Sequence, residues 1–268
     1  MSGFPMIDAN YFREYRSELG FSSQDSAKSF LTGKDISPNI DWKYIEELNI
    51  RLKDILMKLN SVVDKSISQK NINAFIEEYI SKPYLILKAN NMIENLNNQG
   101  RRPEQVYFSW MRGYVISQYF LEALEEIFSV ELDQIEFIGD DDLRNPETFK
   151  RTPKADLEVK TLYGGKIRLE IQSGFTGIND IKQHKVLEAK RIKKTKKKHT
   201  LAIHFDIYNG QVAFIPLDEI ADDNVNWITR QQMEGQTVFN IEQNYFLWKL
   251  LEKPMQYKDI MLILKGHE

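Results

Sequence analysis

The stretch PKADLEVKTLYGGKIRLEIQS, residues 153–173, decides the fold of this chain. Within it, residues 155–161 and residues 166–173 each alternate strictly between apolar and polar side chains. An alternation of this kind is typical of a strand with one buried face and one polar face. A glycine pair between the two runs supplies the backbone freedom that a tight turn needs. The stretch therefore predicts a β-hairpin.

The parity of the side chains restricts how the two strands can pair. A two-residue loop would place each polar residue opposite an apolar one, whereas a three-residue loop at residues 163–165, with a glycine bulge, keeps the faces matched. The three-residue loop is therefore expected. It places Asp156 opposite Gln172 and diagonal to Glu170, and it places Glu158 directly opposite Glu170.

In this register the carboxylates of Asp156 and Glu170 are expected to share one divalent cation. Two carboxylates this close repel each other, so without a cation the pKa of at least one of them should rise. Their hard oxygen ligands suit Mg²⁺. Such an ion polarises a phosphoryl oxygen and stabilises a leaving oxygen, which is the chemistry of phosphodiester hydrolysis. The pattern therefore indicates a metal-dependent nuclease.

Asp156, followed by Glu170-Ile171-Gln172 on the next strand, resembles the motif of the PD-(D/E)xK nucleases, in the E-x-Q form of some type II restriction endonucleases. Two residues separate Pro153 from Asp156, and Gln172 stands where most members have lysine. The resemblance implies a Mg²⁺-dependent enzyme that cuts double-stranded DNA at a short specific sequence. It further implies a homodimer that works beside a DNA methyltransferase. Asp156 and Glu170 would bind the metal, and Gln172 would be catalytic.

Lys160 is the residue expected to replace the missing lysine, because it lies diagonal to Glu170 in this register. A second interpretation uses Glu158-Val159-Lys160, which is itself an E-x-K sequence, with an upstream acid at Asp140, Asp141 or Asp142. It ranks lower because its acid falls in a loop and not on a paired strand. Glu158 is then left as a weak candidate for an accessory ligand.

The elements around the hairpin are expected in the order α-β-β-β-α-β, which is the order of the family core. They are a helix at 107–128, a strand at 134–138, the two motif strands, a helix from Asn179 or Asp180 to about Ile192, and strands at 201–208 and 211–217. The expected fold is α/β (α+β), with a restriction-endonuclease-like core. Its mixed central sheet is flanked by helices, and its N-terminal part is helical.

Arg112-Gly113 in the first of these helices resembles the R-G-x-x-x-E sequence of the family, whose acid would fall near Ser117 or Gln118. Neither is acidic. Glu122, one turn further on, is a weak candidate for an accessory acid. Its ordinary interpretation is a solvated helix face.

Basic residues are concentrated directly after the motif, between residues 182 and 198. Such a run can bind phosphates, and it is equally typical of a solvated helix end. The expected DNA contacts are Lys182, Lys185, Lys190 and Arg191 to phosphates, with Ser173 and Thr176 in the recognition loop. The net charge is only −3, so a DNA contact must come from a local patch.

The composition, with 42% hydrophobic residues, 28% charged residues and no cysteine, is that of a soluble protein without disulfides or cysteine-based zinc sites. The N-terminus lacks the apolar core of a signal peptide, so a cytoplasmic location is expected. Three regions are expected. They are a helical region at 1–100, the nuclease core at 101–222, and a helical region at 223–268 that packs on the core or forms a dimer interface.

Other functions remain open alongside a restriction endonuclease. One is a nuclease of the same fold that serves repair, recombination or transposition. Another is a non-catalytic DNA-binding protein on a nuclease-like scaffold, which the missing lysine favours. A third is an interaction protein whose acidic face binds a partner. The polar positions can also be the solvated face of an ordinary β-meander.

Overall fold

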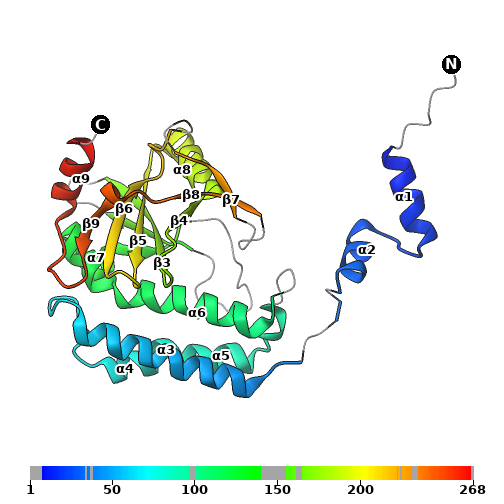
Figure 1. Cartoon of the computed structure of the whole chain (residues 1–268), viewed down its shortest axis with the longest axis horizontal. Helices are drawn as coiled ribbons and strands as arrows, with labels where there is room; N and C mark the ends of the chain where they lie inside the picture. Colours follow the sequence, from blue (N-terminus) through cyan, green and yellow to red (C-terminus); the bar gives the residue numbers. More distant parts are fainter. Residues whose placement is uncertain are drawn as a thin grey trace.

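A mixed sheet of six strands lies at the centre of the molecule, in the order β1-β2-β3-β5-β6-β9 (Figure 1). The computed structural model describes residues 8–33, 35–36, 39–96, 101–139, 155–160, 165–221, 223, 225–230 and 235–266. The strands are β1 (Ile135–Phe137), β2 (Leu157–Lys160), β3 (Lys166–Gly174), β5 (His199–Asp206), β6 (Gln211–Pro216) and β9 (Phe246–Lys249). β3 and β5 pair in parallel, and the other neighbours pair antiparallel. The fold is therefore mixed α/β.

Helices cover one face of this sheet, with α6 lying along the sheet and α3 and α5 packed beyond it (Figure 1). The helices of this layer are α3 (Trp42–Val62), α4 (Ile72–Ile76), a π-helical segment (Glu77–Ser81), α5 (Lys82–Ala89), α6 (Pro103–Tyr119) and α7 (Leu121–Phe128). Leu52 of α3, Val115 of α6 and Leu169 of β3 belong to one continuous buried cluster. The N-terminal helices from α3 onward therefore share the core of the sheet.

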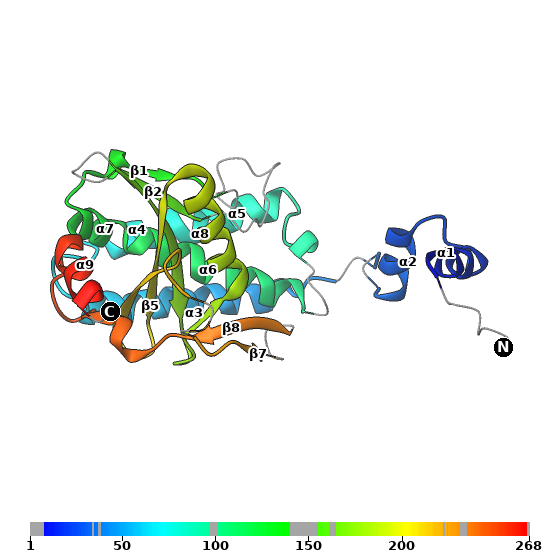
Figure 2. The same cartoon turned by 90° about the horizontal axis from the view of Figure 1, so that it is seen from above.

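The other face of the sheet is covered by α8 (Gln183–Lys196), which connects the parallel strands β3 and β5, and by a small second sheet (Figure 2). Its strands pair in the order β4 (Asp180–Lys182), β8 (Gln236–Asn240) and β7 (Ile228–Arg230). Val186 of α8, Ala202 of β5 and Phe239 of β8 are fully or almost fully buried in a second apolar cluster.

Two helices at the N-terminus project away from this body as an arm (Figures 1 and 2). They are α1 (Ala9–Glu18) and α2 (Gln24–Leu31). No residue of α1 is buried, and Ala27 is the buried residue of α2. The arm adds little to the apolar core.

The C-terminal part completes the sheet edge. Trp248 of β9 is buried, and its ring centroid lies 6.5 Å from that of Phe120 and 6.3 Å from that of Phe205. Helix α9 (Tyr257–Gly266) follows, and single-turn 3₁₀ segments occur at Glu94–Leu96, Leu132–Gln134 and Gln243–Tyr245. In the part of the chain that the structure describes, no helix has both the length and the apolar character needed to cross a membrane.

Most of the elements expected from the sequence are confirmed. The hairpin strands, the strand at 135–137, the helical N-terminal part and the β5–β6 hairpin, which turns at Gly210 with φ +69°, are all present. The helix expected at 107–128 begins earlier, at Pro103, and is interrupted at Phe120.

Two expectations are wrong. The helix after the motif does not begin at Asn179 or Asp180, because residues 180–182 are extended and pair with β8. The C-terminal region is not wholly helical either, since it contributes β7, β8 and β9 before α9. The first error arises because β4 pairs with the distant β8, which leaves no local signal in the sequence. The second has a different cause, since β7 and β8 are close in the chain and form a local antiparallel pair in a region expected to be helical.

Candidate active site

The strand pair β2–β3 carries the residues of the candidate site, in a register that differs from the expected one. Leu157 pairs with Leu169, Glu158 with Arg168, and Lys160 with Lys166. The expected register, with Glu158 opposite Glu170, is wrong by two residues, because residues 161–165 connect the strands instead of a three-residue loop. An even shift keeps every side chain on its expected face, so the parity argument holds.

Asp156 lies directly before β2 and is held against β3 by two hydrogen bonds. Its backbone N–H donates to the carbonyl oxygen of Leu169 at 3.0 Å, and its Oδ2 accepts from the N–H of Ile171 at 2.7 Å. Both contacts flank Glu170. A backbone N–H donated to a carboxylate favours its ionised form. The structure therefore places Asp156 beside Glu170, as the hypothesis of a shared site requires.

Glu170 is a buried carboxylate, only 5% exposed, with a lysine as its partner. The Nζ of Lys185 lies 2.7 Å from Oε1 and 2.9 Å from Oε2. Lys185 is in the first turn of α8, next to the buried Val186 that anchors this helix on the sheet. The crossover helix therefore supplies an ammonium group to the acid of the motif.

Lys160 does not take the role expected of it. It is exposed at the end of β2, opposite Lys166, because of the two-residue change in register. Lys185, expected only as a phosphate contact, occupies the position next to Glu170 instead. The ammonium that lies against Glu170 thus belongs to helix α8 and not to β2, and Lys185 follows Glu170 by fifteen residues in the chain.

Gln172 is half-buried on the same face of β3 as Glu170, and it pairs in register with His204 of β5. Ser173 is half-buried at the end of the strand, and Thr176 is exposed in the bend that follows. The expected recognition residues thus continue directly from the motif strand.

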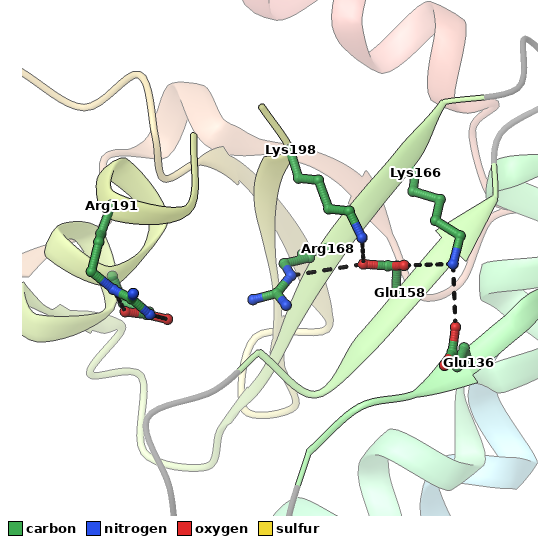
Figure 3. Close-up of polar contacts among 7 residues, drawn as sticks. Glu136, Glu158, Lys166, Arg168, Arg191 and Lys198 are labelled. Carbon is green, nitrogen blue, oxygen red and sulfur yellow. Dashed lines mark hydrogen bonds and ion pairs between the residues drawn. The ribbon is translucent and has the colours of Figure 1, made fainter. Parts of the chain in front are cut away.

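Glu158, the weak candidate for an accessory ligand, is surrounded by three cationic side chains (Figure 3). Its carboxylate oxygens lie 2.6 Å from Lys198 Nζ, 2.7 Å from Lys166 Nζ and 3.8 Å from Arg168 Nε. Burial opposes its ionisation, but the hydrogen bonds from Lys166 and Lys198 outweigh burial and hold the pKa of Glu158 below its ordinary value. The network ties together the ends of three strands, because Lys166 also pairs with Glu136 of β1 at 3.4 Å.

The remaining expected contacts are more scattered. The guanidinium of Arg191 forms a bidentate ion pair with Glu188, with Nε 2.7 Å from Oε2 and Nη2 2.8 Å from Oε1. Lys182 and Lys190 are half-buried. Glu122 is exposed at the start of α7, with Tyr119 and Glu125 as electrostatic neighbours. The structure does not bring Glu122 to the motif strands.

A cleft of about 220 Å³ lies between α6 and the strand pair, and Asp156 and Ile171 are in its lining. The α6 side includes Gly113, Ser117 and Gln118. A Cβ added to Gly113 would meet no atom within 4 Å, so this glycine leaves the cleft open. At the two positions where the resemblance would call for an acid, the cleft is lined by the hydroxyl of Ser117 and the amide of Gln118.

A buried polar network lies beyond the motif strand, where β3 and β5 end. Asn179 accepts a hydrogen bond from His204 Nε2 at 2.8 Å, and its Nδ2 donates to Asp206 Oδ2 at 2.9 Å. Burial lowers the pKa of His204 to about 4, against the opposing attraction of Asp206 and Asp180. Gly174 passes so close that an added Cβ would lie 2.7 Å from Asn179 Oδ1. This network holds the loop after β3.

A second group of possible metal ligands was not evident from sequence spacing. Within the described ranges, His199, Asp218 and Glu219 bring ligand atoms within 4.8 Å of one another, and His199 Nδ1 lies 2.8 Å from Asp218 Oδ2. Lys193 Nζ, however, lies 3.7 Å from the same Asp218 oxygen. An ammonium therefore lies close to one carboxylate of this group. His199 begins β5, whereas Asp218 and Glu219 follow β6, so these residues meet only in the folded chain. No short sequence motif therefore predicts the cluster.

Comparison of the chain with models of known protein families and with curated proteins finds no match. Several expected features lie outside the described residues. They are Asp140, Asp141 and Asp142 of the alternative motif, Pro153, and Tyr163-Gly164 of the turn.

Proposed function

We propose that this protein is a Mg²⁺-dependent nuclease that hydrolyses phosphodiester bonds of double-stranded DNA, and in particular a type II restriction endonuclease. One observation carries the proposal. Asp156 and Glu170 stand at neighbouring positions of two paired strands, and the ammonium of Lys185 lies on Glu170. Two carboxylates with one lysine are the groups that the resemblance to PD-(D/E)xK nucleases calls for. A homodimer and an accompanying DNA methyltransferase belong to the same proposal.

The arrangement of elements supports this reading. The order α6–α7, β1, β2, β3, α8, β5 reproduces the expected α-β-β-β-α-β succession, with the short β4 inserted before α8. β1, β2 and β3 pair antiparallel, and β3 and β5 pair in parallel through α8. A restriction-endonuclease-like core would have this succession, with the motif on β2 and β3.

The donor set suits Mg²⁺, because Asp156 and Glu170 offer hard carboxylate oxygens and the chain contains no cysteine. When bound, the ion would supply Lewis-acid stabilisation of the charge that develops on the phosphoryl group. Asp156 is oriented for this task by the N–H of Ile171, and Glu170 by Lys185.

Lys185 would act on the substrate as well as on Glu170. During hydrolysis, a water oxygen bonds to phosphorus as the bond to the leaving oxygen breaks, and negative charge grows on the phosphoryl oxygens. An ammonium beside Glu170 stabilises that charge. Gln172 is on the same face of β3, and its amide can accept a hydrogen bond from water and donate one to phosphate.

The test is digestion of long viral and plasmid DNA with Mg²⁺, read as a fragment pattern on a gel. We expect sharp bands from the wild-type chain and no cleavage with a chelator, with Glu170→Ala or with Lys185→Gln. Lys194→Gln, an exposed lysine of the same helix, is the matched control and should cut like the wild type. A smear that depends on Mg²⁺ and Glu170 would instead favour a repair or recombination nuclease of the same fold.

A second candidate is a non-catalytic DNA-binding protein on this scaffold. The specific observation in its favour is that both oxygens of Glu170 are already within hydrogen-bond distance of Lys185, as in a structural ion pair. DNA binding that persists in chelator, together with intact DNA in every digest, would select this alternative.

A further inference from the structure

Arg112 of α6 is enclosed by aromatic rings and not by acids. Its guanidinium carbon lies 4.9 Å from the ring centroid of Phe108, one turn earlier in the helix, and 4.6 Å from that of Phe175. The second ring comes from the loop directly after β3. Two rings hold the flat guanidinium in a defined orientation, because cations are attracted to aromatic faces.

No carboxylate neutralises Arg112 in the part of the chain that the structure describes. Its Nε is buried and makes no hydrogen bond there. Burial lowers the pKa of Arg112, and the nearby positive charge of Arg101 lowers it further. Arg102 and Arg230 differ from Arg112, since Arg102 pairs with Glu104 at 2.7 Å and Arg230 with Asp180 at 2.9 Å.

Among the residues that the structure describes, no acid offsets the cost of this arrangement. A half-buried cation without an anionic partner destabilises the folded state, and an apolar side chain would pack against Phe108 and Phe175 without that penalty. A second positive charge, Arg101, adds repulsion. An anion that binds at Arg112 would offset both the burial of its charge and the repulsion from Arg101.

The position of Arg112 indicates which anion this is. Its neighbour Gly113 lines the cleft that contains Asp156, and Phe175 follows Gln172 by three residues. Arg112 therefore contacts the loop after β3 and is the helix neighbour of a residue that lines the cleft. A phosphodiester next to the one that is cut would pass through this region.

We propose that Arg112, oriented by Phe108 and Phe175 and assisted by Arg101, binds a backbone phosphate of the DNA. The inference rests on the proposed function, because it takes DNA as the substrate. It adds a phosphate site that is separate from Asp156, Glu170 and the lysines of α8. The loop after β3 would then be positioned by the same arginine that holds the phosphate.

The test is the affinity of the full-length chain for a fluorescein-labelled DNA duplex, measured by fluorescence anisotropy in chelator over a series of salt concentrations. Arg112→Gln should weaken binding roughly tenfold at low salt. It should also reduce the slope of log affinity against log salt by about one, the value for one lost phosphate contact. Arg101→Gln should act in the same direction.

Three further variants make the result specific. Phe175→Leu keeps the charge, so it should weaken binding and leave the salt slope unchanged. Arg51→Gln, an exposed arginine of α3, should leave both quantities unchanged. Arg101 is exposed, so Arg101→Gln keeps the test valid even where Arg112→Gln lowers the melting temperature.

Wild-type affinity and salt slope in both Arg112→Gln and Arg101→Gln would overturn this inference while leaving cleavage by the wild-type chain intact. The proposed function fails in a different way. Undigested DNA in the Mg²⁺ assay contradicts catalysis, even where Arg112→Gln shows the expected loss of binding.

Discussion

At the scale of single residues, Glu170 is a buried carboxylate whose charge is balanced by Lys185. Its side chain is 7% exposed, that of Lys185 is 15% exposed, and the two charges compensate each other. A buried carboxylate that loses its partner retains its desolvation cost without the compensating attraction. The ion pair is thus a stability element as well as a candidate catalytic pair.

Lys185→Met should destabilise the folded chain by about 3 kcal/mol, because it leaves Glu170 buried without its ammonium. The double variant Lys185→Met/Glu170→Gln should recover much of this loss. Urea unfolding followed by circular dichroism measures both. Mg²⁺ should raise the melting temperature of Lys185→Met more than that of the wild type, because Glu170 has then lost the ammonium of Lys185 and gains another cation.

Lys194→Met is the control, since it removes an exposed lysine from the same helix and should change stability by less than about 0.5 kcal/mol. Equal stability of Lys185→Met and the wild type would contradict the importance of this ion pair.

Because His204 is buried, we expect the free energy of unfolding to decrease in weak acid. Its pKa falls from 6.5 to about 4 on folding, so between these values the unfolded chain binds the proton and the folded chain does not. Stability is therefore complete above pH 6.5 and decreases as the pH falls towards 4. The expected decrease from this residue is about 3 kcal/mol.

Urea unfolding at pH 7 and pH 4.5 checks this expectation, with His204→Gln as the comparison. The variant is less stable at pH 7 because the hydrogen bond with Asn179 is altered, but its stability should depend less on pH. The same dependence in both proteins would show that other groups, such as Asp206, are responsible.

The sequence predicted a shared site at Asp156 and Glu170 with Lys160 as the accompanying lysine, whereas in the structure the lysine that lies against Glu170 is Lys185. Alternation specifies which face a side chain occupies, so the two acids were placed on one face correctly. It does not specify loop length, and a two-residue change carried Lys160 away from Glu170. Lys185 became a neighbour only through the packing of α8, which no local pattern describes.

At the scale of elements, helix α6 contains Gly113 in its interior, where glycine is less favourable for helix stability than alanine. A Cβ at Gly113 would meet no atom within 4 Å. Gly113→Ala should therefore stabilise the protein by up to about 1 kcal/mol, through the better helix propensity of alanine. Chemical denaturation measures the gain. An unchanged or lower stability would mean that the cleft side of α6 does not tolerate a methyl group.

Gly174→Ala, at the end of β3, is the same substitution as Gly113→Ala but is expected to have the opposite effect on stability. Its Cβ would lie 2.7 Å from Asn179 Oδ1 and 2.9 Å from His204 Nε2, which is closer than packing allows. The same substitution should therefore lower stability here, and the contrast separates helix propensity from steric exclusion.

The elements themselves were largely predictable where their pattern was local. The alternation in residues 166–173 predicted β3, and the Asn209-Gly210 turn predicted the β5–β6 hairpin. The short β4 was missed, because Asp180–Lys182 is extended only through its pairing with Val238–Asn240. Contacts between distant segments decide such elements.

At the scale of the whole molecule, the N-terminal arm is separable from the body. Helix α1 buries no residue and α2 buries only Ala27, while Tyr11, Phe12 and Tyr15 are about half exposed. A chain that begins at Asn39 should keep its stability within about 0.5 kcal/mol of the full-length chain. Urea unfolding of the two chains makes the comparison. A clearly lower midpoint in the shortened chain would show that the arm supports the body.

The sequence predicted a mixed sheet flanked by helices. It did not predict that the N-terminal helices and strand β9 share the core of that sheet. The first hundred residues were expected as a helical region whose role stayed open, and in the structure Ile45, Leu52 and Ile80 belong to the same buried cluster as Leu169 and Trp248. Helical periodicity marks an apolar face, but it does not say which surface covers that face.

Strand β9 sets the order in which the protein can be completed during synthesis. Trp248 pairs with Val212 of β6, and the carbonyl of Leu250 accepts a hydrogen bond from the N–H of Asp64, far back in the sequence. Until Phe246–Lys249 leaves the ribosome, β6 has an open edge on which another nascent chain can pair. The protein is thus most exposed to aggregation after β6 has emerged and before β9 follows it, and termination within that interval leaves the edge of β6 uncovered.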